Sequence, residues 1–171
     1  MFMRVDMSFP VAVMFDPHLL DLYSERMKAL IAQVPIQRPL TMAEGTAQRH
    51  SPLCGSRVTL SVVLDKSGCL QQIGYDLDAC SLATAATAIV LKAAPGSSVP
   101  ELEGIRHTVY QMLKEQPVTL PTGKWADIEI LQPAALVKSR HSSVLLPFDT
   151  LLAAMSEAMM RRGASIHSSQ P

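Results

Sequence analysis

The chain has 171 residues, close to the common size of one domain, so a single hydrophobic core is expected and two independent cores are not. Apolar residues make up 48% and charged residues 18%, which argues against an intrinsically disordered chain. The 15 basic and 15 acidic side chains cancel, so no net charge attracts nucleic acid or an anionic membrane. We therefore expect neither nucleic acid nor a membrane as a main partner.

The cysteines and the N-terminal segment indicate where the protein works. The chain has three cysteines, Cys54, Cys69 and Cys80, which is an odd number and too few for a disulfide framework. They form no C-x-x-C pair, so free thiols in a reducing compartment fit best. The apolar run at 9–15 contains a proline and is far too short to span a membrane. We therefore expect a soluble, cytoplasmic protein.

The first half of the chain predicts one helix and then a small antiparallel sheet. A helix is predicted over about 17–33, where an Asp-Pro pair supplies an N-cap and a first-turn proline. Apolar and polar residues then alternate with the period of a half-buried strand, and the turn at 65–68 contains a glycine that allows a hairpin. The extended segments are predicted at 46–50, 57–64 and 72–77.

The second half predicts a series of helices. Ser98 and Glu101 form a capping box before the second of them, and prolines separate the others. The helices are predicted at about 81–94, 99–115, 125–132 and 148–159. This order predicts an α+β fold with about three strands and lacks the βαβ alternation of a parallel nucleotide-binding sheet. Residues 1–163 should form a single domain, and 164–171 a disordered tail.

Two cysteines lie where a thiol can be functional. Cys54 lies in a tight Pro- and Gly-containing turn before the first long strand, and a thiol on a turn can point outward. Cys80 lies where the alanine-rich helix begins, and the amides of a helix N-terminus favour a thiolate. The alternative stays open for both, because cysteine is more often a small core residue. Cys69 directly follows the hairpin glycine and is interpreted as structural.

A histidine near the last helix extends this candidate site. His141 precedes that helix, and a neutral imidazole there can join two thiolates around a metal ion. A lone histidine is more often a surface or capping residue, so this alternative also stays open. His50, four residues before Cys54, is a further candidate, but the intervening proline hides the relative direction of the two side chains.

Four short motifs occur in a specific order. They are Pro52-Leu53-Cys54-Gly55, Asp78-Ala79-Cys80-Ser81, Asp127-Ile128-Glu129, and the segment from Arg140 to Leu146-Pro147-Phe148. Together with the hairpin they resemble the NifU-like iron–sulfur cluster scaffold family over about Tyr23 to Met155. The long segment before Asp127 resembles the SufU-type branch more than the IscU-type branch. The resemblance implies a SufE/NifU-like architecture, with a small antiparallel sheet packed against several helices.

The resemblance also implies a function. Family members accept sulfur from a cysteine desulfurase and build a transient iron–sulfur cluster for apo iron–sulfur proteins, whereas SufU-type members act as zinc-dependent sulfur-transfer partners. The family site uses three cysteines and an aspartate, and Cys54 and Cys80 match the first two cysteines. We therefore expect a scaffold or carrier, not an enzyme, with Cys54, Cys80 and His141 holding a transient cluster or an iron or zinc ion. Cys80 or Cys54 would be the sulfur acceptor.

Two family ligands are replaced by serine. Ser56 stands where the family has its aspartate, and Ser143, or Ser142 in the alternative register, stands at the third cysteine. A hydroxyl is a poor ligand for zinc or cluster iron beside thiolate and imidazole. The missing ligand would come from water, glutathione or a second subunit, so a homodimer is one arrangement to expect.

Two other functions are compatible with these replacements. One is a metal-free interaction module, an adaptor that keeps the docking surface of the family and has lost its site chemistry. The other is a thiol enzyme with Cys80 as nucleophile and His141 as base, which requires the two side chains to lie within hydrogen-bonding distance.

Overall fold

The computed structural model describes residues 24–35 and 37–167. The predicted helix at 17–33 appears as a shorter α2, and its residues 17–23 lie outside the described part. The elements are, in chain order, α2 Glu25–Ala32, β1 Gln37–Arg38, β2 Gly45–His50, β3 Arg57–Leu64, β4 Leu70–Asp78, α3 Ser81–Ala93, α4 Val99–Leu113, the 3-10 helices η2 Gly123–Leu136 and η3 Lys138–Arg140, and α5 His141–His167.

The strands form one antiparallel sheet in the order β1-β4-β3-β2. Along β3 every second residue is buried, because Val58, Leu60, Val62 and Leu64 face the core. The predicted alternation and hairpin are confirmed. The sheet has four strands where about three were expected, because β1 has only two residues and leaves no pattern in the sequence.

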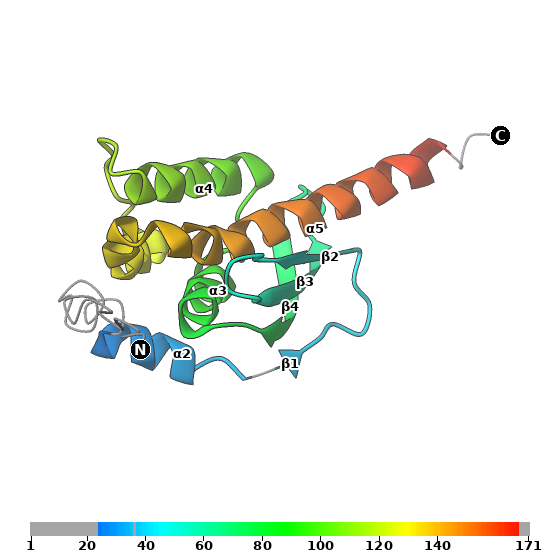
Figure 1. Ribbon diagram of the computed structural model, residues 1–171. Helices are drawn as coiled ribbons and strands as arrows, with labels where there is room; N and C mark the ends of the chain where they lie inside the picture. Colours follow the sequence, from blue (N-terminus) through cyan, green and yellow to red (C-terminus); the bar gives the residue numbers. More distant parts are fainter. Residues whose placement is uncertain (1–23, 36, 168–171) are drawn as a thin grey trace, which may run out of the picture.

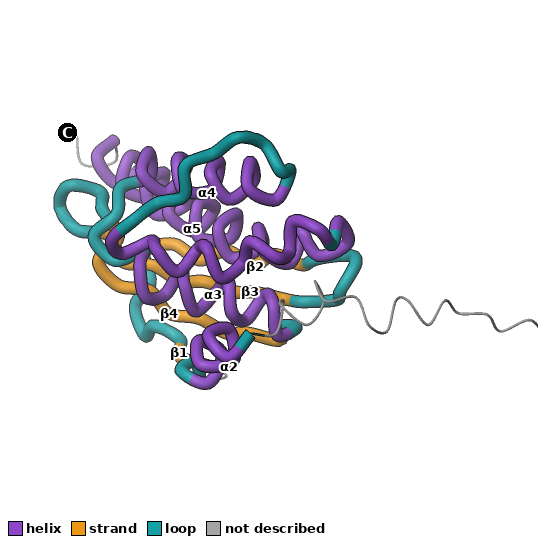
Figure 2. Tube along the Cα trace, turned by 90° about the vertical axis from the view of Figure 1, so that its left-hand side faces the viewer, coloured by secondary structure: helices purple, strands orange, loops and turns teal. Residues whose placement is uncertain are grey.

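The helices cover one face of this sheet (Figures 1 and 2). α5 runs across β2 and β3, α3 packs beside it, and α4 lies on the side of α5 away from the sheet (Figure 1). α2 packs against α3 at the edge of this layer. Together these contacts form one hydrophobic core between the sheet and the helices. The predicted α+β fold is confirmed.

The helix signals in the sequence have direct structural counterparts. Ser98 is the N-cap of α4, and its Oγ accepts a hydrogen bond from the backbone N–H of Glu101 at 3.3 Å. α3 is rich in alanine, and nine of its residues are buried because small side chains let it approach α5, α2 and η2 closely. Since α3 begins directly after β4, Cys80 lies at the junction between the two.

The last helix begins earlier than predicted. α5 starts at His141 instead of near residue 148 and contains Pro147 in its second turn. Proline has no N–H for the carbonyl four residues before it, so Ser143 O is without its helical bond, but the turn persists. The helical span Lys138–Ser165 is long and apolar enough to cross a membrane, but 56% of its most apolar stretch is buried inside the molecule, as in a core helix.

The C-terminal end of α5 extends past the expected domain boundary. The helix continues to His167, beyond residue 164, where a disordered tail was expected to begin. The rest of that segment, 168–171, lies outside the described residues. The assignment of 1–163 to a single domain stays a prediction.

Candidate functional site

The loop between β2 and β3 carries Cys54. Two backbone hydrogen bonds close this loop, from Ser51 N–H to Ser56 O at 2.8 Å and from Gly55 N–H to Ser51 O at 2.9 Å. Gly55 has a φ of 69°, in the left-handed region that favours glycine. The predicted turn therefore exists, and it holds Cys54 half-buried directly before β3.

The Cys54 sulfur lies between two buried hydroxyls. In the neutral form its S–H donates to Ser56 Oγ at 3.0 Å, and the sulfur shares a second hydrogen bond of 3.0 Å with Ser143 Oγ, in which either atom can donate. In the thiolate form the sulfur accepts from these hydroxyls. Ser56 is 2% exposed and Ser143 is fully buried. The first turn of α5 thus meets the β2–β3 loop at this sulfur. The two serines in contact with it are Ser56 and one of the two serines that the resemblance assigns to the third cysteine.

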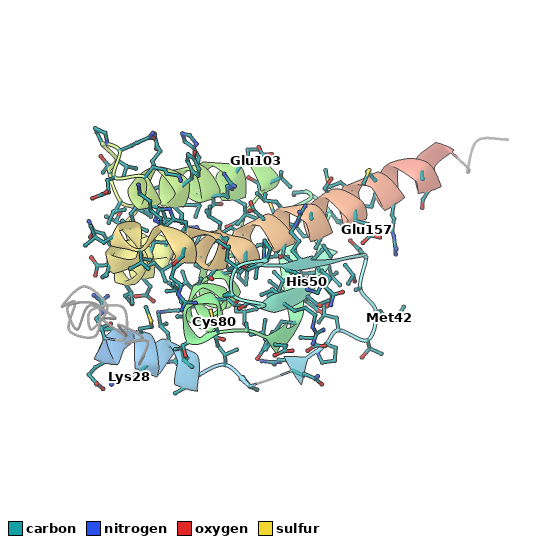
Figure 3. The ribbon with its side chains drawn as sticks, in the orientation of Figure 1. Lys28, Met42, His50, Cys80, Glu103 and Glu157 are labelled. Atoms are coloured by element: carbon teal, nitrogen blue, oxygen red, sulfur yellow. The ribbon has the colours of Figure 1, made fainter. Side chains whose placement is uncertain are left out.

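Ser56 also connects the two candidate cysteines. Its Oγ accepts the backbone N–H of Cys80 at 2.9 Å while it contacts the Cys54 sulfur. Cys80 is the N-cap residue of α3 and is half-buried (Figure 3). Its side chain makes no capping hydrogen bond to α3. One hydroxyl therefore holds the Cys54 loop against the start of α3.

A hydrogen bond between two serines also joins the β2–β3 loop to α5. Ser51 Oγ and Ser142 Oγ form a hydrogen bond of 2.9 Å between the loop and α5. Ser51 is 1% exposed. Ser51 carries no functional signal of its own in the sequence, because a serine beside a proline is typical of an exposed turn and its partner is 91 residues away. Serine recurs in the segments 51–56 and 139–143, and this recurrence is the signal that could have found it.

The hydroxyls around Cys54 change its acidity. Burial raises the pKa of the Cys54 thiol, but hydrogen bonds with the hydroxyls of Ser143, Ser51 and Ser56, and with the Ser56 backbone amide, outweigh it. The pKa falls from an ordinary 9.0 to about 6. At neutral pH Cys54 is therefore a thiolate, the form of cysteine that acts as nucleophile and metal ligand.

His141 lies in the first turn of α5 and not in a loop before it. Its Nε2 is 3.0 Å from the carbonyl oxygen of Ala135, so this nitrogen is committed to η2. Its Nδ1 is buried without a hydrogen-bond partner among the described residues. The proposed pairing of His141 with Cys80 as base and nucleophile has no hydrogen bond between the two residues in the described part of the chain.

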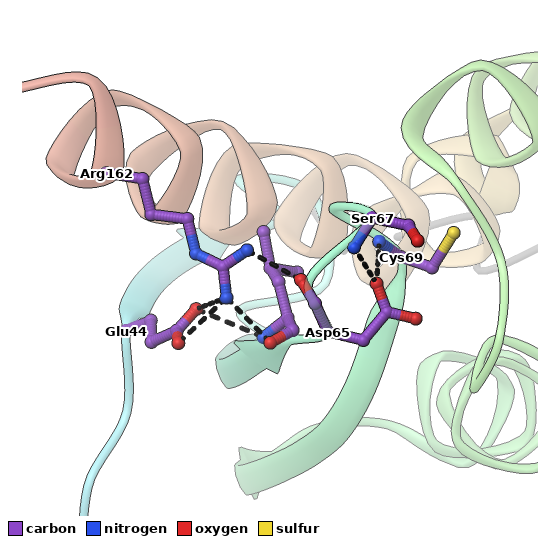
Figure 4. Close-up of polar contacts among 6 residues, drawn as sticks. Glu44, Asp65, Ser67, Cys69 and Arg162 are labelled. Carbon is purple, nitrogen blue, oxygen red and sulfur yellow. Dashed lines mark hydrogen bonds and ion pairs between the residues drawn. The ribbon is translucent and has the colours of Figure 1, made fainter. Parts of the chain in front are cut away.

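The other candidates lie elsewhere. Cys69 is in the β3–β4 turn, where its backbone N–H donates to Asp65 Oδ1 at 3.0 Å (Figure 4). His50 is exposed at the end of β2 (Figure 3). It lines a pocket of about 470 Å³ together with Arg49, Ser51 and Ser142. This pocket adjoins the Cys54 loop on the side of Ser51 and Ser142.

The donor set does not fit a tetrahedral metal site. Within residues 24–35 and 37–167, no group of three or more His, Cys, Asp or Glu side chains could hold a metal ion. Around Cys54 the neighbouring side chains are hydroxyls, which zinc and iron bind poorly compared with thiolate or carboxylate. The ligand set Cys54, Cys80 and His141 stays a prediction.

Comparison with known proteins gives the family. The model of the NifU-like N terminal domain matches residues 33–141, more than half of the chain and including both Cys54 and Cys80. The chain belongs to the NifU-like N-terminal domain family. The resemblance read from the sequence motifs is confirmed. A search of curated proteins gives no match.

Solved structures agree with this family. A nitrogen-fixing NifU-like protein (N-terminal) from Brucella abortus is 28% identical, with a TM-score of 0.76, covering 84% of this chain and 98% of that one. A putative iron–sulfur cluster assembly scaffold protein for the SUF system from Fervidobacterium islandicum is 18% identical, with a TM-score of 0.72, covering 82% and 99%. At that identity the second likeness shows the fold alone.

Proposed function

We propose that this NifU-like protein works in iron–sulfur cluster assembly as a scaffold-type carrier and not as an enzyme. Its family and its likeness to the Brucella abortus NifU-like protein support this role. The observation that supports it is the contact of Ser56 Oγ with the Cys54 sulfur and with the backbone N–H of Cys80, because it joins the loop that carries one of these cysteines to the helix start that carries the other. Cysteines at these two positions would receive and pass on a component of a cluster.

The partners follow from that role. A cysteine desulfurase would supply sulfur, apo iron–sulfur proteins would receive the product, and the cytoplasm would be the place of work. The Cys54 loop is accessible to such partners, because Leu53 beside it is 71% exposed although it is a large apolar residue. An exposed leucine next to a thiolate offers a partner an apolar contact at the point of transfer.

The test is a reconstituted assembly reaction. A cysteine desulfurase from the same genome, cysteine, ferrous iron and an apo-ferredoxin are mixed anaerobically, with and without this protein, and cluster formation is followed by visible absorbance. We expect the protein to accelerate formation, and Cys54→Ala and Cys80→Ala to lose most of the acceleration. Cys69→Ala is the matched control, since its thiol lies in a different turn, and should behave as wild type. Absence of any acceleration, together with no binding to the desulfurase, would refute the proposal.

The second candidate is a metal-free adaptor of the same machinery. The observation in its favour is that hydroxyls from Ser56 and Ser143 occupy the positions beside Cys54. An adaptor needs its docking surface and not its thiols. If both cysteine variants accelerate assembly as well as wild type, the adaptor function is correct and the carrier function is wrong.

A further inference from the structure

An apolar groove lies between the C-terminal end of α4 and η2. It has a volume of about 640 Å³, and apolar residues from the α4–η2 connection and from η2 line most of it: Val118, Leu120, Pro133 and Leu136. Leu136 is 50% exposed although it lies among these apolar neighbours. A hollow of this size that leaves apolar side chains in contact with water is typical of a site for a ligand or another segment of chain.

The described part of the chain begins beside this groove. Ser24 is the N-cap of α2, and Arg26 in the first turn of α2 donates to Glu129 at 2.6 Å. Glu129 belongs to η2 and lines the groove. The start of α2 is therefore within one arginine side chain of the groove wall, and α2 and η2 lie at the same end of the molecule (Figure 1, where η2 is yellow).

The chain before Ser24 contains a segment that suits an apolar groove. Residues 9–15 read Phe-Pro-Val-Ala-Val-Met-Phe, seven residues without a charged side chain, of which six are apolar and one is proline. Phe15 is nine residues before Ser24, a length of chain that spans about 14 Å as a helix and about 30 Å when extended. Apolar side chains left in water cost free energy, and burial in a neighbouring apolar groove recovers it.

The groove also adjoins the candidate site. Ala135 is one of its lining residues, and the carbonyl oxygen of Ala135 is 3.0 Å from His141 Nε2. A segment that lies in the groove therefore packs against the residue that fixes this imidazole.

We propose that residues 9–15 occupy the groove of their own chain and hold η2 against α4. The occupant comes from the same chain because a segment tethered nine residues from α2 has a high effective concentration at the groove, so a modest apolar contact is enough to keep it there. This inference is independent of the proposed function, since it concerns the groove and not the cysteines.

The first experiment tests whether the segment and the groove are close and belong to one chain. Val13→Cys/Leu136→Cys is made in a chain whose three native cysteines are replaced by alanine, and disulfide formation under mild oxidation is followed by non-reducing electrophoresis and peptide mass spectrometry. We expect a cross-link within the monomer. Val13→Cys/Leu53→Cys is the matched control, because Leu53 is also an exposed leucine but lies in the Cys54 loop, and it should cross-link at least tenfold more slowly.

Three results of this experiment would overturn the inference. A disulfide-linked dimer would show that the segment of a second copy occupies the groove. Equal cross-linking in the control would show that the segment has no preferred site. Failure of Val13→Cys/Leu136→Cys to cross-link, with a normal circular dichroism spectrum, would show that the segment lies elsewhere.

The second experiment measures protection of the groove by hydrogen–deuterium exchange. Val13→Ser/Phe15→Ser should speed exchange about tenfold in peptides that cover 115–120 and 129–136, because these segments lose their cover. Phe2→Ser/Val5→Ser removes the same kinds of residue outside the segment and should leave these peptides unchanged. No change in the first variant, or an equal change in both, would refute the inference.

The exposed Leu136 tests the same contact from the groove side. Leu136→Ser replaces a half-exposed side chain, so the fold is expected to persist. It should speed exchange in the peptide that covers 9–15 by about tenfold as well. Unchanged exchange in that peptide would mean that residues 9–15 do not contact the groove.

Discussion

The thiol of Cys54 lies among hydroxyls that favour its ionised form. Because its pKa is lowered to about 6, its reaction with iodoacetamide should accelerate as the pH rises through about 6 and level off above that value. Ser143→Ala removes one of the hydrogen bonds and should move the midpoint upward by about one unit. The measurement is the alkylation rate of Cys54 by mass spectrometry as a function of pH.

Cys69 in the same protein serves as an internal control for this titration. Its sulfur belongs to the β3–β4 turn, away from the serines, so Ser143→Ala should leave its alkylation profile unchanged. A Cys54 midpoint near the ordinary value of 9.0 in wild type would show that the hydroxyls do not stabilise the thiolate.

At the level of single residues the sequence could place the cysteines but not their surroundings. The turn around Cys54 was predictable from Pro52 and Gly55, and the position of Cys80 at a helix start from the change of pattern after β4. The contact of Cys54 with Ser143 spans 89 residues, and no local pattern encodes it. The sequence therefore gives no sign that hydroxyls lower the pKa of Cys54.

β2 and α5 approach each other very closely at one residue, Gly45. Gly45 lies at the start of β2, where an added Cβ would lie 2.7 Å from Ala158 N and nearer still to Ala154 O, both of them backbone atoms of α5. We expect Gly45→Ala to lower the free energy of unfolding by about 3 kcal/mol, because strand and helix must move apart. Urea unfolding followed by circular dichroism measures this change.

A second glycine provides the matched control. Gly104 is an exposed residue inside α4, and an added Cβ would meet nothing within 4 Å. Gly104→Ala should stabilise the protein by about 0.5–1 kcal/mol, since alanine is the better helix former. If Gly45→Ala were also stabilising, the close packing of β2 on α5 would be disproved.

Element boundaries were predictable where a local signal sets them. The Ser98 cap and the period-2 pattern of β3 are local, and both were found in the sequence. The start of α5 was not, because Pro147 indicates a helix beginning near it, whereas the residues before it form their contacts with η2 and the β2–β3 loop, which are distant in sequence or irregular. This error placed His141 in a loop, although it lies in a helix.

Across the whole molecule, Arg162 ties the far end of α5 to the sheet. Its guanidinium pairs with Glu44 at 2.8 Å and donates to the carbonyl oxygens of Leu64 at 2.7 Å and Asp65 at 2.6 Å (Figure 4). Glu44 in turn accepts the backbone N–H of Leu64 at 3.1 Å. One side chain therefore joins the last helix, the segment before β2 and the β3–β4 hairpin, and it keeps α5 in register over the sheet.

This contact makes part of the stability depend on pH. The hydrogen bond from Arg162 holds the pKa of Glu44 below its ordinary 4.5; burial opposes this effect, and the Leu64 amide and the charge of Arg162 add to it. The ionised carboxylate therefore stabilises the folded state above pH 4.5, and this stabilisation is lost as the pH falls through the lowered pKa. Glu44→Gln should cost about 0.5–1 kcal/mol at neutral pH, because the pair is about one-third exposed to solvent.

Urea unfolding of wild type and Glu44→Gln over a series of pH values measures this difference. The gap between the two proteins should be largest at neutral pH and should close well below the lowered pKa, where the wild-type carboxyl is also neutral. Glu103→Gln is the control, because Glu103 is an exposed residue of α4 with no ion pair among the described residues, and it should follow wild type at every pH.

A gap that stays constant with pH would mean that Glu44 stabilises the fold through its shape and its bond to Leu64 and not through its charge. In that case the end of α5 is held by the carbonyl contacts of Arg162 alone, and Arg162→Ala should cost more than Glu44→Gln at every pH.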